Sequence, residues 1–168
     1  MSKFRFKLGF AHSLGLAVVI GLIAGGVIIG TCLVWPKSHI PSTYVQQTLY
    51  PVYWPARLPA GYRVDMTSYQ VQDKALIFVA RAPDGRQLVV TEQAKPINFD
   101  FANFYQQQLV NAKTLAGMPY TSVLGSPVGS TATALLSITT ENTWLIITSR
   151  HTLSEQDARL MASHLQRQ

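Results

Sequence analysis

The fold is decided by two neighbouring stretches, KALIFVAR at residues 74–81 and QLVVTEQ at residues 87–93. The first is a continuous apolar run of the length of a strand, and the second follows it after a short break. Between them, APDGR at residues 82–86 places proline and Asp-Gly where they favour a tight turn. Together the three segments predict a β-hairpin.

The residues on either side of this hairpin predict a further strand and a helix. Tyr62, Val64 and Met66 alternate with polar residues, which is the period of a half-buried strand. Residues 100–112 have a helical period instead, and Asp100 is placed to cap the helix. The apolar stripe of this helix consists of Phe101, Tyr105, Leu109 and Ala112.

The C-terminal part predicts more strands and a closing helix. Strands are expected at residues 120–124, 131–140 and 143–150, where β-branched residues become frequent. A capping-box-like pattern starting at Ser154 begins the final helix, residues 154–166. Its apolar side consists of Ala158, Met161, Ala162 and Leu165. We therefore expect an α+β domain with an antiparallel sheet of about five strands and two helices packed on one face.

Composition and charge exclude several classes of protein. Hydrophobic residues make up 48% of the 168 residues and charged ones 13%, which excludes wholesale disorder. The net charge of +6 arises largely in residues 1–40, which have four basic residues and no acidic one. Residues 41–168 have ten Lys or Arg against eight Asp or Glu, so no nucleic-acid partner is expected. A single cysteine, Cys32, excludes an intrachain disulfide and a cysteine-based zinc site.

The N-terminal part predicts a membrane anchor. Residues 14–35 are 22 consecutive residues without a formal charge, enough for a helix to cross a bilayer. Lys3, Arg5 and Lys7 precede this span, so the positive-inside rule places the N-terminus in the cytoplasm. We expect a cell-membrane protein with a cytoplasmic tail (1–13), a transmembrane helix (14–35), a Pro-rich spacer (36–50) and an extracytoplasmic α+β domain (51–168).

Three other interpretations of the N-terminal segment remain open. A cleaved signal peptide would have a shorter apolar core and an A-x-A-like site. A lipoprotein signal would use Cys32, but Thr31 precedes it and the apolar run continues after it. A pilin-like leader is suggested by Gly9-Phe10, although Leu14 stands where a pilin has Glu.

Four glycines could bring two copies of the span together. They are spaced as two small-xxx-small pairs, a pattern that lets helices approach closely in lipid. Alternatively, the four glycines are present only because glycine is common in membrane helices. The expectation is a possible homodimer through the membrane helix, with contacts at Gly21, Gly25, Gly26 and Gly30.

The segment between the span and the first strand is rich in proline and aromatic residues. Five prolines between residues 36 and 61 favour an extended, irregular chain. Tyr50, Tyr53 and Trp54 are too apolar for a plain linker, so we expect them to pack on the domain. They are also the candidate interaction surface for a protein or an envelope polymer.

The sequence contains no catalytic, cofactor or metal motif. It has no H-E-x-x-H, G-x-S-x-G, Walker-type loop or G-x-G-x-x-G pattern. His151 and His164 are 13 residues apart, a spacing that suits no metal pair. Asp84 belongs to the hairpin turn, and Glu92 is expected at a solvated strand edge. We therefore expect no enzyme, no catalytic residues, no cofactor and no metal.

The run PVYWPARLPAGY at residues 51–62 resembles the P-x-x-L-P-x-G-Y motif of an uncharacterised family of bacterial extracytoplasmic domains. Residues 88–93, residues 143–147 and the closing helix at 153–165 fit the same pattern, so the resemblance covers roughly residues 51–166. Members often follow a single membrane span, and some lie C-terminal to anti-sigma factor segments. The resemblance implies a fold similar to the lipoprotein-carrier and sigma-E-regulator fold. It implies no catalytic residues.

One departure from that family limits the function. An anti-sigma factor needs a cytoplasmic domain of several helices, whereas the expected tail of this chain is residues 1–13. We therefore expect a single-pass, membrane-anchored extracytoplasmic binding or sensing module. One alternative is a lipid or lipoprotein acyl-chain carrier, and another is a structural subunit of an envelope pilus or secretion assembly. The carrier's apolar groove would be lined by Phe78, Val79, Leu135, Leu136 and Ile138.

Overall fold

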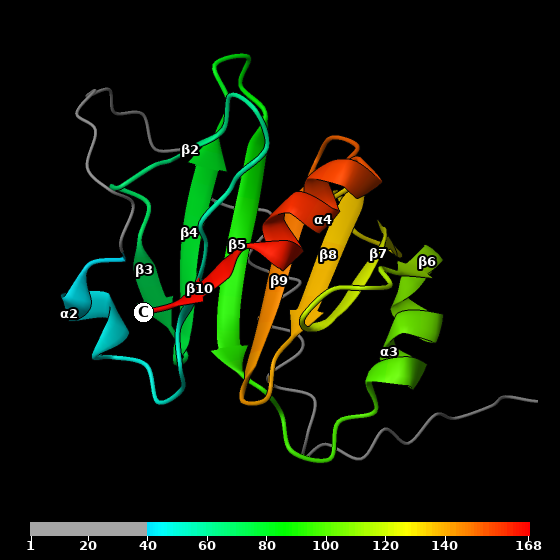
Figure 1. Cartoon of the computed structure of the whole chain (residues 1–168), viewed down its shortest axis with the longest axis horizontal. Helices are drawn as coiled ribbons and strands as arrows, with labels where there is room; N and C mark the ends of the chain where they lie inside the picture. Colours follow the sequence, from blue (N-terminus) through cyan, green and yellow to red (C-terminus); the bar gives the residue numbers. More distant parts are fainter. Residues whose placement is uncertain (1–39) are drawn as a thin grey trace, which may run out of the picture.

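The computed structural model describes residues 40–168 (Figure 1). The expected tail, the transmembrane segment and its four glycines lie outside the described residues. None of the helices between Ile40 and Gln168 has the length and hydropathy that crossing a membrane requires. The domain is of the α+β class, as expected, with a large antiparallel sheet and three helices.

An eight-stranded antiparallel sheet forms the centre of the domain. A separate two-stranded sheet pairs β1, in the N-terminal part of the described chain, with β10 at the C-terminus. The large sheet has the order β2-β4-β5-β9-β8-β7-β6, and β3 also pairs with β4. The strands are β1 (Tyr53–Pro55), β2 (Arg63–Val64), β3 (Gln70–Gln72), β4 (Ala75–Arg81), β5 (Gln87–Ala94), β6 (Leu109–Thr114), β7 (Thr121–Pro127), β8 (Ala134–Thr139), β9 (Thr143–Ser149) and β10 (Leu165–Arg167). The helices are α2 (Ser42–Val45), α3 (Phe101–Gln108) and α4 (Glu155–Ser163).

The predicted hairpin is confirmed as β4 and β5. The pairing runs without a register shift from Leu76 opposite Glu92 to Arg81 opposite Gln87. The turn is closed by a hydrogen bond from the amide of Ala82 to the carbonyl of Arg86, and Gly85 adopts a positive φ of 86°. That conformation suits glycine, so the sequence APDGR specifies the turn locally.

The two longer helices lie on opposite faces of the sheet, so the expectation that both cover one face was wrong. Helix α4 packs Ala158, Met161 and Ala162 into the larger core. Helix α3 and the loop before it cover a second apolar cluster around Trp144 and Leu135. The reason is that β8 and β9 are buried along their whole length, so both of their faces need a cover.

Two expected helices are shorter than predicted, which raises the strand count above five. Helix α3 ends at Gln108, and Leu109 turns to extended backbone and begins β6. Leu109 packs against Gly125 of β7, where an added Cβ would come within 3.0 Å of it. Helix α4 similarly ends at Ser163 and is followed by β10. In both cases, pairing with another strand overrides the helical periodicity: β6 pairs with the next strand, β7, and β10 pairs with β1.

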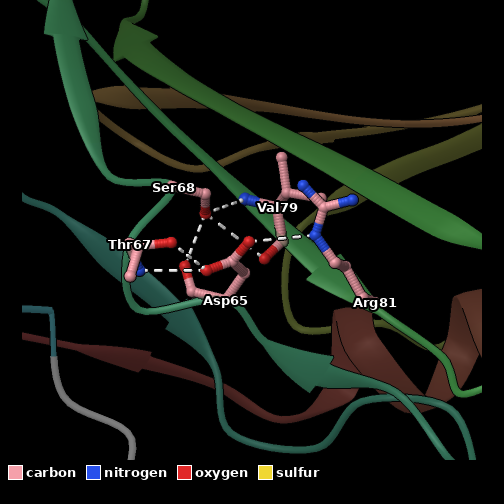
Figure 2. Close-up of polar contacts among 5 residues, drawn as sticks. All are labelled: Asp65, Thr67, Ser68, Val79 and Arg81. Atoms are coloured by element: carbon pink, nitrogen blue, oxygen red, sulfur yellow. Dashed lines mark hydrogen bonds and ion pairs between the residues drawn. The ribbon is translucent and has the colours of Figure 1, made fainter. Parts of the chain in front are cut away.

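Figure 2 shows the polar contacts that hold the segment between β2 and β3 against the edge of β4. One carboxylate oxygen of Asp65 accepts from the amide and the hydroxyl of Thr67, at 3.0 and 2.6 Å. The other pairs with Arg81 Nε at 2.9 Å. The Ser68 hydroxyl accepts from the amide of Val79 at 2.8 Å, where no strand neighbour is available. Burial alone would raise the pKa of Asp65, but hydrogen bonds from Thr67 and Arg81 outweigh it and lower the pKa.

Candidate functional site

Residues 40–55, here termed the strap, run from the start of the described chain across the sheet face that also carries α4 (Figure 1). The strap contains α2 and β1. Its apolar side chains are part of the larger core, with Ile40 4%, Val52 1% and Trp54 3% exposed. The ring of Trp54 stacks on Phe78 of β4, with centroids 5.4 Å apart. The expected spacer is therefore an integral part of the domain from Ile40 onward.

The strap is tied to the C-terminus by backbone hydrogen bonds. Strand β1 pairs with β10, with Trp54 opposite Gln166. The amide of Ala56 donates to the carbonyl of His164 at 2.8 Å, and the amide of Gln168 donates to Val52 at 3.0 Å. Both ends of the described chain therefore hold each other in place over the sheet.

A buried carboxyl group lies beneath the strap. The side chain of Glu92, on β5, is 0% exposed. Its Oε2 accepts a hydrogen bond from the amide of Tyr53 at 3.0 Å, whereas its Oε1 has no hydrogen-bond partner. None of the ion pairs found within residues 40–168 involves Glu92. Burial raises the pKa of Glu92 to about 8, although the Tyr53 amide acts in the opposite direction. The carboxyl group therefore keeps its proton at neutral pH.

The hydroxyl of Tyr50 joins the strap to two strands. It donates to the carbonyl of Glu92 at 2.6 Å and accepts from the amide of Leu76 at 3.1 Å. Leu76 and Glu92 face each other in the β4–β5 ladder, so this side chain bonds to both strands of the hairpin. Burial raises the pKa of Tyr50, and the nearby Glu92 carboxylate raises it further, while the Leu76 amide lowers it.

A second tyrosine completes the buried polar group. The hydroxyl of Tyr69 is buried and has no hydrogen-bond partner. Its ring lies between Tyr44 of α2 and Phe78 of β4, with centroids 5.6 and 5.4 Å away. Burial raises the pKa of Tyr69, and the charge of Glu92 adds to this effect. The group formed by Tyr50, Tyr69 and Glu92, here termed the strap cluster, places one carboxyl group and two hydroxyl groups out of water beneath the strap.

The structure places the expected interaction surface largely inside the domain. Tyr50 and Trp54 are buried, and Tyr53 is half-buried with its ring edge-on to Tyr120 at 5.7 Å. Their expected packing on the domain is confirmed. Two of the three side chains face the core, so only Tyr53 is partly exposed to a partner.

The residues expected to line an acyl-chain groove do not share one surface. Phe78, Leu136 and Ile138 belong to the core beneath α4, whereas Leu135 belongs to the cluster beneath α3. Val79 is half-buried. This division follows from the alternation of side chains along a strand, which sends neighbours to opposite faces.

Glu92 is the residue that sequence reasoning misplaced, since it was expected at a solvated edge. The signal was present in the sequence. Leu88, Val90 and Glu92 alternate along β5, and the first two are fully buried, so a period of two carries Glu92 to the same face. Asp100, by contrast, caps α3 as expected, accepting from the amide of Asn103 at 3.0 Å.

Asp84, His151 and His164 lie in a turn, at the surface and at a helix end. Asp84 accepts from the amide of Arg86 within the hairpin turn. His151 is exposed, and His164 bonds to the carbonyl of Leu160 at the end of α4. Within residues 40–168 no three His, Cys, Asp or Glu side chains are grouped so as to hold a metal ion. Comparison with protein-family models, with curated proteins and with solved structures yields no match.

Proposed function

We propose that this chain is a single-pass, membrane-anchored extracytoplasmic module that binds or senses without catalysis. Its partner would be a protein or an envelope polymer. The proposal joins the apolar, uncharged stretch at residues 14–35 to the α+β domain that follows it.

The observation that carries the proposal is the position of the strap. Only residues 36–39 separate the end of the apolar stretch from Ile40, which is buried in the core. Five residues of extended chain reach at most about 18 Å. A membrane anchor at residues 14–35 would therefore hold the core of the domain close to the bilayer, rather than at the end of a long tether.

The strap cluster adds a reason to favour sensing. The segment nearest the anchor is also the segment that covers Glu92 and bonds to it through Tyr53. A displacement of the strap would expose a carboxyl group that otherwise keeps its proton. The anchor and the interior of the sheet would in this way be coupled through one short stretch of chain.

Labelling of single cysteines in spheroplasts tests the topology. We would replace Cys32 by serine and introduce Gln106→Cys, at an exposed position on α3. A membrane-impermeant maleimide should label this cysteine without lysis and should label a matched Ser2→Cys chain only after lysis. Carbonate extraction should leave both chains in the membrane fraction. The reverse labelling pattern, or release by carbonate, would overturn the proposal.

A further inference from the structure

Four connections gather at one end of the large sheet, here termed the loop end. They are the turn of the strap after α2, the β3–β4 turn, the loop between β5 and α3, and the β8–β9 turn. The Thr143 hydroxyl donates to the carbonyl of Pro51, and the amide of Lys95 donates to the carbonyl of Asn142 at 2.9 Å. The strap turn, the β8–β9 turn and the loop before α3 lie together at the lower edge of the sheet in Figure 1.

The loop end carries the two most exposed large apolar side chains of the described residues. Leu49, in the strap turn, is 77% exposed, and Ile97, in the loop before α3, is 91% exposed. The other exposed large apolar residues, Met66, Val110 and Val128, are between 40% and 52% exposed. Single exposed apolar residues are ordinary, but here the two most exposed ones lie on connections at the same end of the sheet.

The charges at this end nearly balance, which bears on the kind of partner. The exposed charged residues of these connections are Asp73, Lys74, Lys95, Asp100 and Glu141, three acidic and two basic, for a net charge of −1. Such a surface has no electrostatic preference for a polyanion. Exposed apolar side chains with so little net charge around them suit the boundary between lipid headgroups and acyl chains.

The chain itself limits where a bilayer can lie. The uncharged stretch at residues 14–35 ends five residues before Ile40, and Leu49 follows nine residues after Ile40. A tether this short gives the bilayer a high effective concentration at the domain, so weak insertion suffices for docking.

We propose that the loop end docks on the bilayer that anchors the chain, with Leu49 and Ile97 inserted at the headgroup boundary. This inference rests on the proposed membrane anchor. Because the loop end has no excess of basic residues, docking requires no anionic lipid, and a bilayer of phosphatidylcholine is a sufficient probe.

Spin-label accessibility in the full chain tests the docking. The chain, with Cys32→Ser, would be placed in phosphatidylcholine nanodiscs with a nitroxide on Ile97→Cys. We expect more collisions with oxygen than with a water-soluble nickel chelate. The control is a nitroxide on Asp84→Cys, in the β4–β5 turn at the other end of β5. The eight residues of β5 separate the two labels by about 26 Å, so the control label should stay accessible to nickel.

Two further results decide the inference. With the label moved to Lys95→Cys, the double variant Leu49→Ser/Ile97→Ser should gain nickel accessibility several-fold, whereas Val128→Ser should not. Equal nickel accessibility at positions 97 and 84 in a chain that is held in the nanodisc would overturn the docking alone. A chain that does not enter the nanodisc would instead contradict the anchor.

Discussion

Replacing Glu92 by glutamine should remove the pH dependence of strap opening. In the folded domain the carboxyl group is 0% exposed and its pKa is raised to about 8, against an ordinary value of 4.5. When the strap opens, water reaches Glu92 and its pKa returns toward the ordinary value. Between these two values the closed form holds a proton that the open form releases, so the strap is less stable at higher pH.

The size of the effect follows from the same two values. The stabilisation by the protonated carboxyl group is complete below pH 4.5 and is lost as the pH rises through about 8. The difference corresponds to about 5 kcal/mol at most, or up to tenfold in the opening equilibrium per pH unit. Tyr50 and Tyr69 do not titrate in this window, because burial raises the pKa of both.

Hydrogen exchange at the Tyr53 amide, which donates to Glu92 Oε2, measures strap opening directly. Protection should fall between pH 5 and pH 8 in the unmodified chain, relative to Glu92→Gln at each pH. The side-chain oxygen of glutamine can still accept from the Tyr53 amide, but its buried NH2 group has no acceptor, which costs about 1–3 kcal/mol of stability. The slope, not the absolute protection, is therefore the test.

A control variant shows whether that slope comes from Glu92. Glu141→Gln changes an exposed carboxylate in the β8–β9 turn and should keep the slope of the unmodified chain. If Glu92→Gln retained the full slope, the titrating group would lie elsewhere and the reasoning about the strap cluster would fail.

Four other substitutions should separate the contacts that hold the domain. Met161→Ala truncates a fully buried side chain of α4 and should lower the free energy of unfolding by about 2–5 kcal/mol. Ser154→Ala removes only the helix cap and should lower it by about 0.5–2 kcal/mol. Urea unfolding of the two variants measures the difference. Tyr50→Phe removes the hydroxyl that bonds to the Glu92 carbonyl and the Leu76 amide. The free energy of unfolding, measured by urea titration, should fall by about 1–3 kcal/mol. Asp65→Asn should be destabilising at neutral pH. Because the folded pKa of Asp65 is lowered, thermal melts of the two proteins should converge as the pH falls below the ordinary value of 3.8.

Local sequence signals predicted the elements that depend on local physics. The β4–β5 hairpin is specified by its own turn, and Asp100 and Ser154 cap their helices through hydrogen bonds to residues three positions away. Each of these features involves a few consecutive residues, so no knowledge of the rest of the fold was needed.

Features that depend on distant strands were not predictable in the same way. Residues after Gln108 and after Ser163 continue a helical period, yet they form β6 and β10 because β7 and β1 offer backbone partners. The location of α3 depends on Trp144 and Leu135, whose face of the sheet only the complete strand order fixes. From the sequence alone, Tyr50 and Trp54 are equally consistent with an exposed surface and with the core, because the path of the strap decides between the two.

The strap cluster also explains why a carboxyl group suits position 92 better than an aliphatic side chain would. Strand β1 has a backbone neighbour in β10, and the amide of Tyr53 bonds to Glu92 instead of to another strand. A buried amide without an acceptor is costly, so the protonated carboxyl group acts in place of a backbone carbonyl. Its second oxygen then keeps a proton that the carboxyl group releases at lower pH when the strap is open. In our proposal the bilayer contacts Leu49, and Tyr50 beside it bonds to Glu92, so lipid contact and proton release act on the same five residues, 49–53.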